Sequence, residues 1–226
     1  MKTSSPRKKL LPNKTVLQIL SGSIAAYKAG DLIQDLRGEG ARVICVMTES
    51  AKHFVTPLVL RAISGEKVYH DFFSADTPYD VLHTSLAEEA DAVLVSPASA
   101  DFIARLAAGM ADDLASCIVL AVRRPVVIVP AMNDYMYTHP LTQRNLGTLR
   151  QAGYHVIDPI EGPLVCGKEA IGHISENSTI VKELVSLLSL RGGRRPTKAG
   201  ALAPALNKNP LTVPSTRDGT KQSGKL

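Results

Sequence analysis

The stretch from Val16 to Arg37 constrains the fold of this chain more than any other. It begins with the uncharged apolar run VLQIL, which is typical of a strand buried in a parallel sheet. Apolar residues then recur at helical spacing over residues 24–37. A strand that turns sharply into a helix presents free backbone N–H groups, which favour an anion such as a phosphate. The stretch therefore predicts a strand, a turn and a helix, with an anion site at the turn.

The turn itself, Ser21-Gly22-Ser23, has two interpretations. Gly22 lacks a side chain, so its backbone can approach a ligand closely, and the two serine hydroxyls can donate further hydrogen bonds. Alternatively, Gly22 serves only to make a tight turn. The stretch has neither a G-x-G-x-x-G nor a Walker pattern, which favours a mononucleotide over NAD.

Strand-like and helix-like segments alternate along the rest of the chain. Strands are expected at residues 41–48, 67–73 (a short edge strand), 91–96, 123–130 and 154–157, and helices at 57–64, up to about 90, 102–108, 114–122, 141–151 and 178–190, the last with Ser178 as its N-cap. Residues 131–140 and 158–172 are expected to be loops. This alternation predicts an α/β fold with a doubly wound, three-layer parallel sheet.

Small polar residues follow each of the main expected strands. The segments are Ser21-Gly22-Ser23, Thr48-Glu49-Ser50, Ser96-Pro97-Ala98-Ser99 and Pro130-Ala131-Met132-Asn133. Open α/β sheets bind ligands at the carboxyl ends of their strands. We therefore expect a ligand at this edge of the sheet.

The composition limits the domain organisation and the class of partner. Residues 1–14 are expected to form a flexible basic arm, 15–190 one folded domain, and 191–226 a disordered tail rich in Gly, Pro and Lys. The two ends supply much of the net charge of +5, and aromatic residues make up only 4%, so a nucleic-acid surface is not expected. No apolar run reaches the roughly 20 residues of a membrane span.

The three cysteines are far apart and form no C-x-x-C pair. A disulfide scaffold or a zinc site is therefore not expected, and a reducing cytoplasm fits. Cys45 and Cys117 lie in apolar segments and are expected in the core. Cys166 lies in a loop rich in glycine and proline, where it is either a reactive thiol on a mobile lid or a spectator. The histidines show no metal-ligand spacing, so no metal site is expected.

Other candidate functional residues lie in or beside the polar loops. His83, at a helix start, suits proton transfer, or is an ordinary surface or capping histidine. Asn133 can bind a carboxylate or an amide, or cap its own backbone. Met132 and Met136 are either substrate-facing walls or core and lid contacts.

Four motifs in order resemble one known family. They are Gly22-Ser23-Ile24-Ala25-Ala26-Tyr27-Lys28, Ser96-Pro97-Ala98-Ser99-Ala100-Asp101, Pro130-Ala131-Met132-Asn133-Asp134-Tyr135-Met136-Tyr137 and Cys166-Gly167. Together they resemble the flavin-dependent cysteine decarboxylases, and most of all the phosphopantothenoylcysteine decarboxylases of coenzyme A synthesis. The resemblance covers about residues 15–190.

The resemblance implies a flavodoxin-like fold that binds FMN at the strand ends. The residues implied to hold FMN are Gly22, Ser23, Ile24, Thr48, Ser50, Ser96, Ala98 and Ser99. It also implies a homotrimer or a homododecamer built from trimers, with the active site between subunits.

The resemblance assigns roles to the other candidates as well. His83 matches the catalytic histidine, Asn133 the residue that grips the substrate carboxylate, and Cys166 the thiol that completes the reduction. FMN would accept electrons from the substrate thiol before CO2 leaves, and would then return them. The implied reaction converts 4′-phosphopantothenoylcysteine to 4′-phosphopantetheine.

The chain also departs from the family pattern. Tyr137 stands where Trp is common, and Asp101-Phe102 where Asn-Thr is common. After Cys166 the usual G-D-x-G-x-G-R-M becomes a run in which His173 replaces the arginine. Two other functions stay open: oxidative decarboxylation of the C-terminal cysteine of a ribosomal peptide, and a non-enzymatic flavin-binding regulatory subunit.

Overall fold

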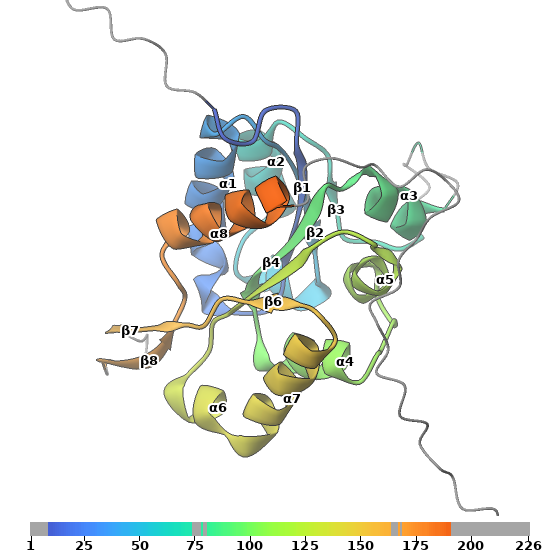
Figure 1. Ribbon diagram of the computed structural model, residues 1–226. Helices are drawn as coiled ribbons and strands as arrows, with labels where there is room; N and C mark the ends of the chain where they lie inside the picture. Colours follow the sequence, from blue (N-terminus) through green and yellow to red (C-terminus); the bar gives the residue numbers. More distant parts are fainter. Residues whose placement is uncertain (1–8, 74–77, 79–80, 164–166, 168, 191–226) are drawn as a thin grey trace, which may run out of the picture.

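A computed structural model describes residues 9–73, 78, 81–163, 167 and 169–190 of the protein. Its main sheet has six parallel strands in the order β3-β2-β1-β4-β5-β6 (Figure 1). These strands are β1 (Thr15–Leu20), β2 (Arg42–Met47), β3 (Val68–Tyr69), β4 (Ala92–Ala98), β5 (Val126–Pro130) and β6 (His155–Val156). The order reverses between β1 and β4, as expected for a doubly wound sheet.

Helices cover both faces of the sheet. They are η1 (Ile24–Lys28), α1 (Ala29–Gly38), η2 (Glu49–His53), α2 (Pro57–Ser64), α3 (Leu82–Glu89), α4 (Ala100–Ala107), α5 (Leu114–Ala121), α6 (Asp134–Thr138), α7 (Pro140–Gln151) and α8 (Asn177–Leu190). Helices α1, α2 and α8 pack on one face, and α3, α4, α5 and α7 on the other. The predicted three-layer α/β architecture is confirmed.

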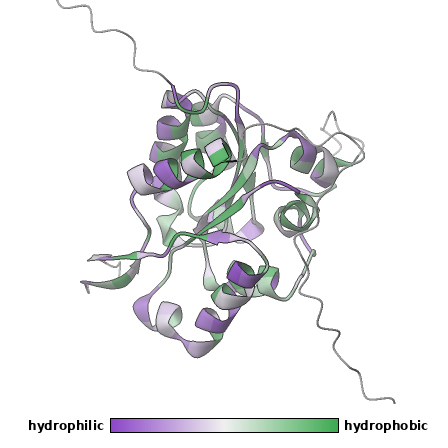
Figure 2. Ribbon diagram, viewed as in Figure 1, coloured by the Kyte–Doolittle hydropathy of each residue, from purple (hydrophilic) through white to green (hydrophobic). Residues whose placement is uncertain are grey.

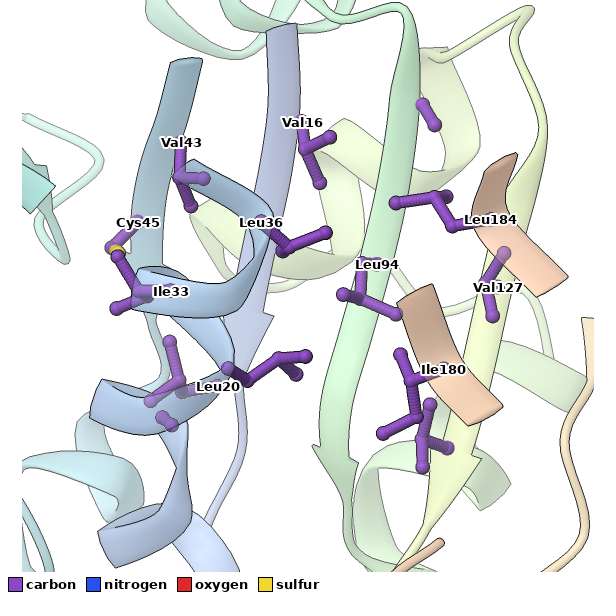
Figure 3. Close-up of a cluster of buried hydrophobic side chains, with 14 of the residues drawn as sticks. Val16, Leu20, Ile33, Leu36, Val43, Cys45, Leu94, Val127, Ile180 and Leu184 are labelled. Carbon is purple, nitrogen blue, oxygen red and sulfur yellow. The ribbon is translucent and has the colours of Figure 1, made fainter. Parts of the chain in front are cut away.

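Both faces of the central strands are buried, which explains why the strand sequences are largely apolar rather than alternating, with the buried Gln18 of β1 and Ser96 of β4 as exceptions. In β1, Val16 and Leu20 belong to the cluster beneath α1 and α8 (Figure 3), whereas Leu17 and Ile19 belong to the opposite cluster. Apolar residues fill the centre of the molecule accordingly (Figure 2). Burial of each such aliphatic side chain stabilises the folded state by about 1.5–3 kcal/mol relative to leaving it exposed.

Several expected elements are confirmed close to their predicted bounds. Helix α2 begins at Pro57 and ends at Ser64 as predicted. The edge strand expected at residues 67–73 is present, but β3 covers only Val68–Tyr69. Strand β4 runs two residues past the predicted Ser96, to Ala98. The helix predicted over residues 24–37 is two elements, because the first turn is the 3-10 helix η1 and α1 starts at Ala29.

Two segments predicted as loops contain regular structure. Residues 134–138 form α6, where the Asn133 side chain accepts a hydrogen bond from the Tyr135 amide. Residues expected in the long loop form the antiparallel pair β7 (Ile160–Pro163) and β8 (Glu169–His173). The loop interpretation was wrong for residues 134–138, 160–163 and 169–172. In the hairpin, glycine and proline suggested irregular chain where pairing and docking impose strands.

Two end positions also differ from expectation. Leu11 is buried in the core and its amide donates to the Glu39 carbonyl at 2.9 Å, so packed structure begins before residue 15. Helix α8 starts at Asn177 rather than after Ser178, and the Asn177 side-chain amide donates to the Asp35 carboxylate on α1 at 3.0 Å. Among the described residues, no helix is long and apolar enough to cross a bilayer.

Candidate active site

The turn after β1 is tied to the end of β4. The Ser21 hydroxyl donates to the Pro97 carbonyl at 2.8 Å and accepts from the Ser99 amide, also at 2.8 Å. The Ser21 amide donates to the same Pro97 carbonyl at 3.2 Å. The Ser21 hydroxyl therefore joins two strand ends and is not available to a ligand, contrary to what its position in the sequence suggested.

Ser23 links the same turn to the end of β5. Its hydroxyl donates to the Ala131 carbonyl at 3.0 Å and accepts from the Ala25 amide, which caps η1. The Ala131 amide in turn donates to the Ala98 carbonyl at 3.0 Å. The loops after β1, β4 and β5 thus form one hydrogen-bonded edge, and Ile24 begins η1 from it.

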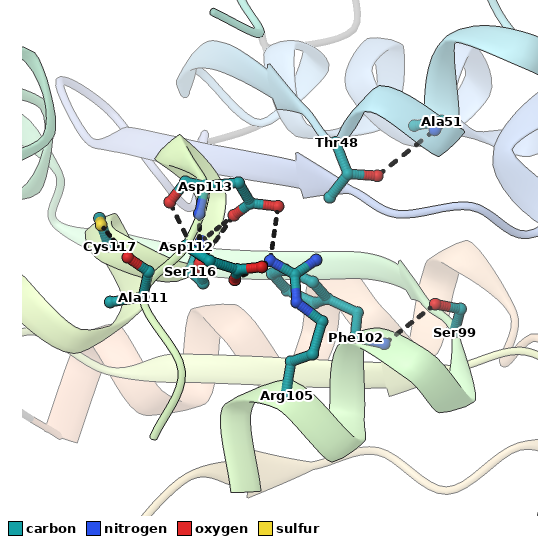
Figure 4. Close-up of polar contacts among 10 residues, drawn as sticks. All are labelled: Thr48, Ala51, Ser99, Phe102, Arg105, Ala111, Asp112, Asp113, Ser116 and Cys117. Atoms are coloured by element: carbon teal, nitrogen blue, oxygen red, sulfur yellow. Dashed lines mark hydrogen bonds and ion pairs between the residues drawn. The ribbon is translucent and has the colours of Figure 1, made fainter. Parts of the chain in front are cut away.

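Gly22 is required by the neighbouring turn. A Cβ at Gly22 would lie 2.5 Å from the Ser50 Cβ, a distance that real side chains do not reach. The glycine therefore lets the loops after β1 and β2 approach each other, a reason that neither sequence interpretation contained. Thr48, at the end of β2, caps η2 by accepting from the Ala51 amide at 3.3 Å (Figure 4).

At the carboxyl end of β4, the side chain of Ser99 is partly exposed, whereas those of the strand residues are not. Ser96 and Ala98 are buried within β4, whereas Ser99 is half-buried and begins α4. The Ser99 hydroxyl oxygen accepts from the Phe102 amide at 3.2 Å and keeps its own hydrogen available for donation. The first amides of α4 also lie here, at a helix N-terminus that favours an anion.

An ion-pair cluster fixes α4 against α5. Arg105 on α4 pairs with Asp112 and, at 2.9 Å, with Asp113 (Figure 4). Hydrogen bonding to Arg105 lowers the pKa of Asp112. Asp113 also caps α5 through the Ser116 amide at 2.7 Å.

Cys117, expected in the core, is only half-buried and its thiol donates to the Ala111 carbonyl at 3.2 Å.

A cavity of about 210 Å³ opens beside the end of β5. Its walls come from η1, the segment after β5, and both strands of the β7–β8 hairpin. Met132, Asn133 and Ile24 line it, and their placement brings these predicted site residues together. Met136 does not line the cavity and is about half exposed on α6.

The hairpin docks on the segment after β5 through Gly172. The Met132 amide donates to the Gly172 carbonyl at 3.2 Å, and a Cβ at Gly172 would lie 2.3 Å from the Met132 carbonyl oxygen. From α6, the Tyr137 hydroxyl donates to Asp158 at 2.9 Å. Burial, followed by Asp158, raises the pKa of Tyr137, which keeps the phenol protonated as the donor.

His83 lies apart from this cavity. It is half-buried in the first turn of α3, with its ring centroid 5.3 Å from that of Phe72. Its Nδ1 atom is buried without a hydrogen-bond partner among the described residues. Helix α3 and the β7–β8 hairpin lie on opposite sides of the molecule (Figure 1). One chain therefore does not bring His83 and Asn133 together.

Cys166, predicted as either a reactive thiol or a spectator, lies outside the described residues.

Two residues that the sequence did not single out, Lys28 and His173, meet at the cavity wall. In the sequence, the signal for this position was that His173 replaces the arginine of the family pattern. No group of three or more metal-ligating side chains gathers in the described part of the chain.

Comparison with known proteins identifies the family. The family profile described as Flavoprotein matches residues 4–189. The chain belongs to this flavoprotein family. Its relatives include the coenzyme A biosynthesis bifunctional protein CoaBC of Bacillus subtilis, 45% identical over 76% of this chain and 43% of that protein. The chain thus spans less than half the length of that flavoprotein relative.

Other flavoprotein relatives match along nearly their whole length. A probable phosphopantothenoylcysteine decarboxylase of Streptococcus mutans is 40% identical over 76% of this chain and 97% of its own. A PPC decarboxylase mutant complexed with pantothenoylaminoethenethiol superposes with a TM-score of 0.69 at 34% identity, over 76% of this chain and 96% of that one. The FMN-dependent cysteine decarboxylase SpaF gives 0.72 at 29% identity, over 81% and 99%.

Proposed function

We propose that this flavoprotein decarboxylates 4′-phosphopantothenoylcysteine to 4′-phosphopantetheine, with FMN as its cofactor, in coenzyme A biosynthesis. One observation carries the proposal: a cavity lined by Asn133 adjoins the polar strand edge, in a chain that aligns with nearly all of a probable phosphopantothenoylcysteine decarboxylase. The chemistry of both places suits the two ligands.

The donor set at the strand edge fits a flavin phosphate. Ser99 and Thr48 use their oxygens as helix caps and retain hydroxyl hydrogens, and the first amides of α4 point from the same edge. We assign the phosphate to Gly22 and Ser99, with Ile24, Thr48 and Ser50 nearby. Ser23 would act by holding this turn in place, because its hydroxyl already donates to the Ala131 carbonyl. Ser96 and Ala98 would act through the backbone, because their side chains are buried.

Bound FMN would supply a reversible acceptor for two electrons, which the loss of CO2 from a cysteine carboxylate requires. Asn133 lines the cavity, and we assign its amide to orienting that carboxylate without adding a charge. A neutral amide suits a group that must leave uncharged, because a cation would stabilise the bound carboxylate more than the transition state. Cys166 is assigned to the final proton donation.

We further propose that the active site forms between subunits of a homotrimer or homododecamer. His83 and Asn133 lie apart in one chain, and the buried Nδ1 atom of His83 leaves Nε2 as the nitrogen for proton transfer. His83 of a neighbouring subunit would face the substrate held by Asn133. Sedimentation of the purified protein should show an assembly larger than one chain.

Release of labelled CO2 from carboxyl-labelled substrate tests the function. His83→Asn should abolish release while the protein keeps its flavin absorbance, because the substitution removes the proton-transfer group and leaves the strand edge intact. His70→Asn, at an exposed position, is the matched control and should release CO2 as the unsubstituted protein does. Loss of flavin from His83→Asn would instead make His83 a structural residue.

A second candidate, decarboxylation of a peptide C-terminal cysteine, is the alternative that the sequence motifs left open, and SpaF is described more generally as an FMN-dependent cysteine decarboxylase. The higher identity to the coenzyme A proteins, 40–45%, favours the first candidate. Incubation with a peptide ending in cysteine separates the two, because only the second candidate predicts turnover of the peptide.

A further inference from the structure

Lys28 and His173 meet at the wall of the Asn133 cavity. The Lys28 Nζ atom lies 2.7 Å from the His173 Nε2 atom, and both residues line the cavity. Lys28 is the last residue of η1 and His173 the last residue of β8. The contact therefore joins the segment after β1 to the β7–β8 hairpin.

The hydrogen-bond partners fix the proton positions on His173. A lysine ammonium can only donate, so Nε2 of His173 must be the acceptor and carries no proton. The other ring nitrogen, Nδ1, lies 3.0 Å from the Pro163 carbonyl oxygen, which can only accept. His173 is therefore neutral in this arrangement, with its proton on Nδ1, and its ring is held from both sides.

The charge of Lys28 is uncompensated within the part of the chain that the structure describes, where its ammonium makes no ion pair. The ionisable side chains on the elements around His173 are Tyr27 and Lys28 on η1, Asp134, Tyr135 and Tyr137 on α6, Glu161 on β7 and Glu169 on β8. Both glutamates are exposed. The neighbouring cavity walls are largely apolar, with Ile24, Met132 and Ile174. A cation at the wall of such a cavity is a recognition point for an anion.

We propose that Lys28 and His173 form the subsite for the phosphate monoester of the substrate, an inference that rests on the proposed function. A phosphate monoester carries a charge of about −1.5 to −2 near pH 7. As it binds, His173 takes one proton from solvent on Nε2 and donates it in a hydrogen bond to a phosphate oxygen. Lys28 then turns its N–H groups from the imidazole to the phosphate, so that two cations face the dianion.

The phosphate suits this pair better than the cysteine carboxylate does. The carboxylate loses its charge as CO2 departs, so a pair of cations hydrogen-bonded directly to it would slow the reaction, whereas Asn133 would bind it without a charge. The phosphate keeps its charge throughout, and its binding energy can hold the substrate without opposing the chemistry. Because His173 also contacts Pro163 and follows Gly172, the phosphate would hold the hairpin over the cavity.

Calorimetry on the flavin-loaded full chain tests the subsite with two ligands, 4′-phosphopantetheine and pantetheine, which differ only in the phosphate. The phosphorylated ligand should bind roughly ten- to hundredfold more tightly, as expected for hydrogen bonds to a charged group. Titrations slightly above neutral pH, in buffers of different ionisation enthalpy, should show uptake of up to one proton.

Three variants assign these effects. Lys28→Met should lose most of the preference for the phosphorylated ligand and keep its affinity for pantetheine. His173→Gln should abolish the proton uptake, because glutamine cannot take up a proton. Lys182→Met removes the same charge from an exposed position on α8 and should behave as the unsubstituted protein.

The outcomes separate this inference from the proposed function. If the protein decarboxylates the substrate but binds both ligands equally, or if Lys28→Met weakens both equally, the phosphate subsite is wrong and the function stands. If Lys28→Met loses its flavin, the pair serves the cofactor phosphate instead. If the flavin-loaded protein neither binds these ligands nor decarboxylates the substrate, the proposed function is wrong, and the subsite with it.

Discussion

Replacement of Gly172 by alanine should undock the β7–β8 hairpin from the substrate cavity. Gly172 has a φ of +125°, which side-chain-bearing residues rarely adopt, and its added Cβ would lie 2.3 Å from the Met132 carbonyl oxygen. The obstacle is backbone, so no side-chain rotation relieves it. Strand β8 must therefore move away from the segment after β5.

The cost can be worked from two contributions. A non-glycine residue in such a backbone conformation costs about 1–3 kcal/mol. Moving β8 away also breaks the hydrogen bond from the Met132 amide to the Gly172 carbonyl, worth about 0.5–1.5 kcal/mol. The sum of about 1.5–4.5 kcal/mol is enough to open a locally docked hairpin, but is below the stability of a typical domain.

Hydrogen exchange measured by mass spectrometry would show the effect. In Gly172→Ala, amides of residues 160–162 and 169–173 and that of Met132 should exchange much faster, whereas those of β1 and β4 should not. Gly153→Ala is the matched control, since Gly153 has a φ of +88° but open space around its Cβ. It should cost only the backbone strain, about 1–2 kcal/mol, and leave the hairpin protected.

Unchanged exchange in the hairpin of Gly172→Ala would refute this reasoning. So would equal losses in Gly172→Ala and Gly153→Ala, because the backbone strain alone would then account for both. Faster exchange across the whole sheet would show that the hairpin belongs to the global core instead of forming a separately docked unit.

Three further predictions concern stability. Asp113→Ala removes the cap of α5 and the partner of Arg105, and should lower the free energy of unfolding by about 1 kcal/mol in urea titration, with Asp113→Asn retaining more of it. Burial raises the pKa of Cys45 from 9.0 to about 12, so the neutral thiol stabilises the fold fully below pH 9 and this stabilisation is lost as pH rises toward 12. Cys45→Val should remove up to about 1.4 kcal/mol per pH unit from that alkaline slope, and equal slopes would contradict the assignment. Tyr137→Phe deletes the hydrogen bond to Asp158 and should cost about 0.5–1.5 kcal/mol in thermal unfolding, with no cost expected if that bond forms only transiently.

The sheet and its helices were predictable because their signals are local. Pro57 marks the first turn of α2 correctly, since proline suits a position whose amide has no intrahelical partner. The uncharged run of β1 indicates a strand buried on both faces. Each signal depends on residues within a few positions of one another, so the sequence carries it without knowledge of the tertiary structure.

The hairpin was missed because tertiary contacts stabilise it, and α6 because it is short. Gly172 suggests a loop, yet it is glycine because β8 must pass close to Met132. Helix α6 is five residues long, too short to show periodicity, although its Asn133 cap is a local contact that the sequence allowed. The approach of Gly172 to Met132 cannot be inferred from neighbouring residues alone.

The candidate site also contains some residues whose placement the sequence predicts and others whose placement it does not. The polar strand ends, with Asn133 among them, could be predicted because parallel strands bring their carboxyl ends to one edge. The pair of Lys28 and His173 could not, because 145 residues separate them in the chain. The role of Gly22 in admitting Ser50 likewise depends on how two loops pack.

The mass of the product formed from 4′-phosphopantothenoylcysteine by the purified, flavin-loaded protein tests the central claim most directly. The account predicts loss of CO2 alone, because the electrons taken from the substrate are returned to it. Loss of CO2 together with two hydrogens would show that the reduction is not completed and would favour peptide modification. An unchanged substrate mass, with protein that is yellow with flavin, would contradict the proposed decarboxylase.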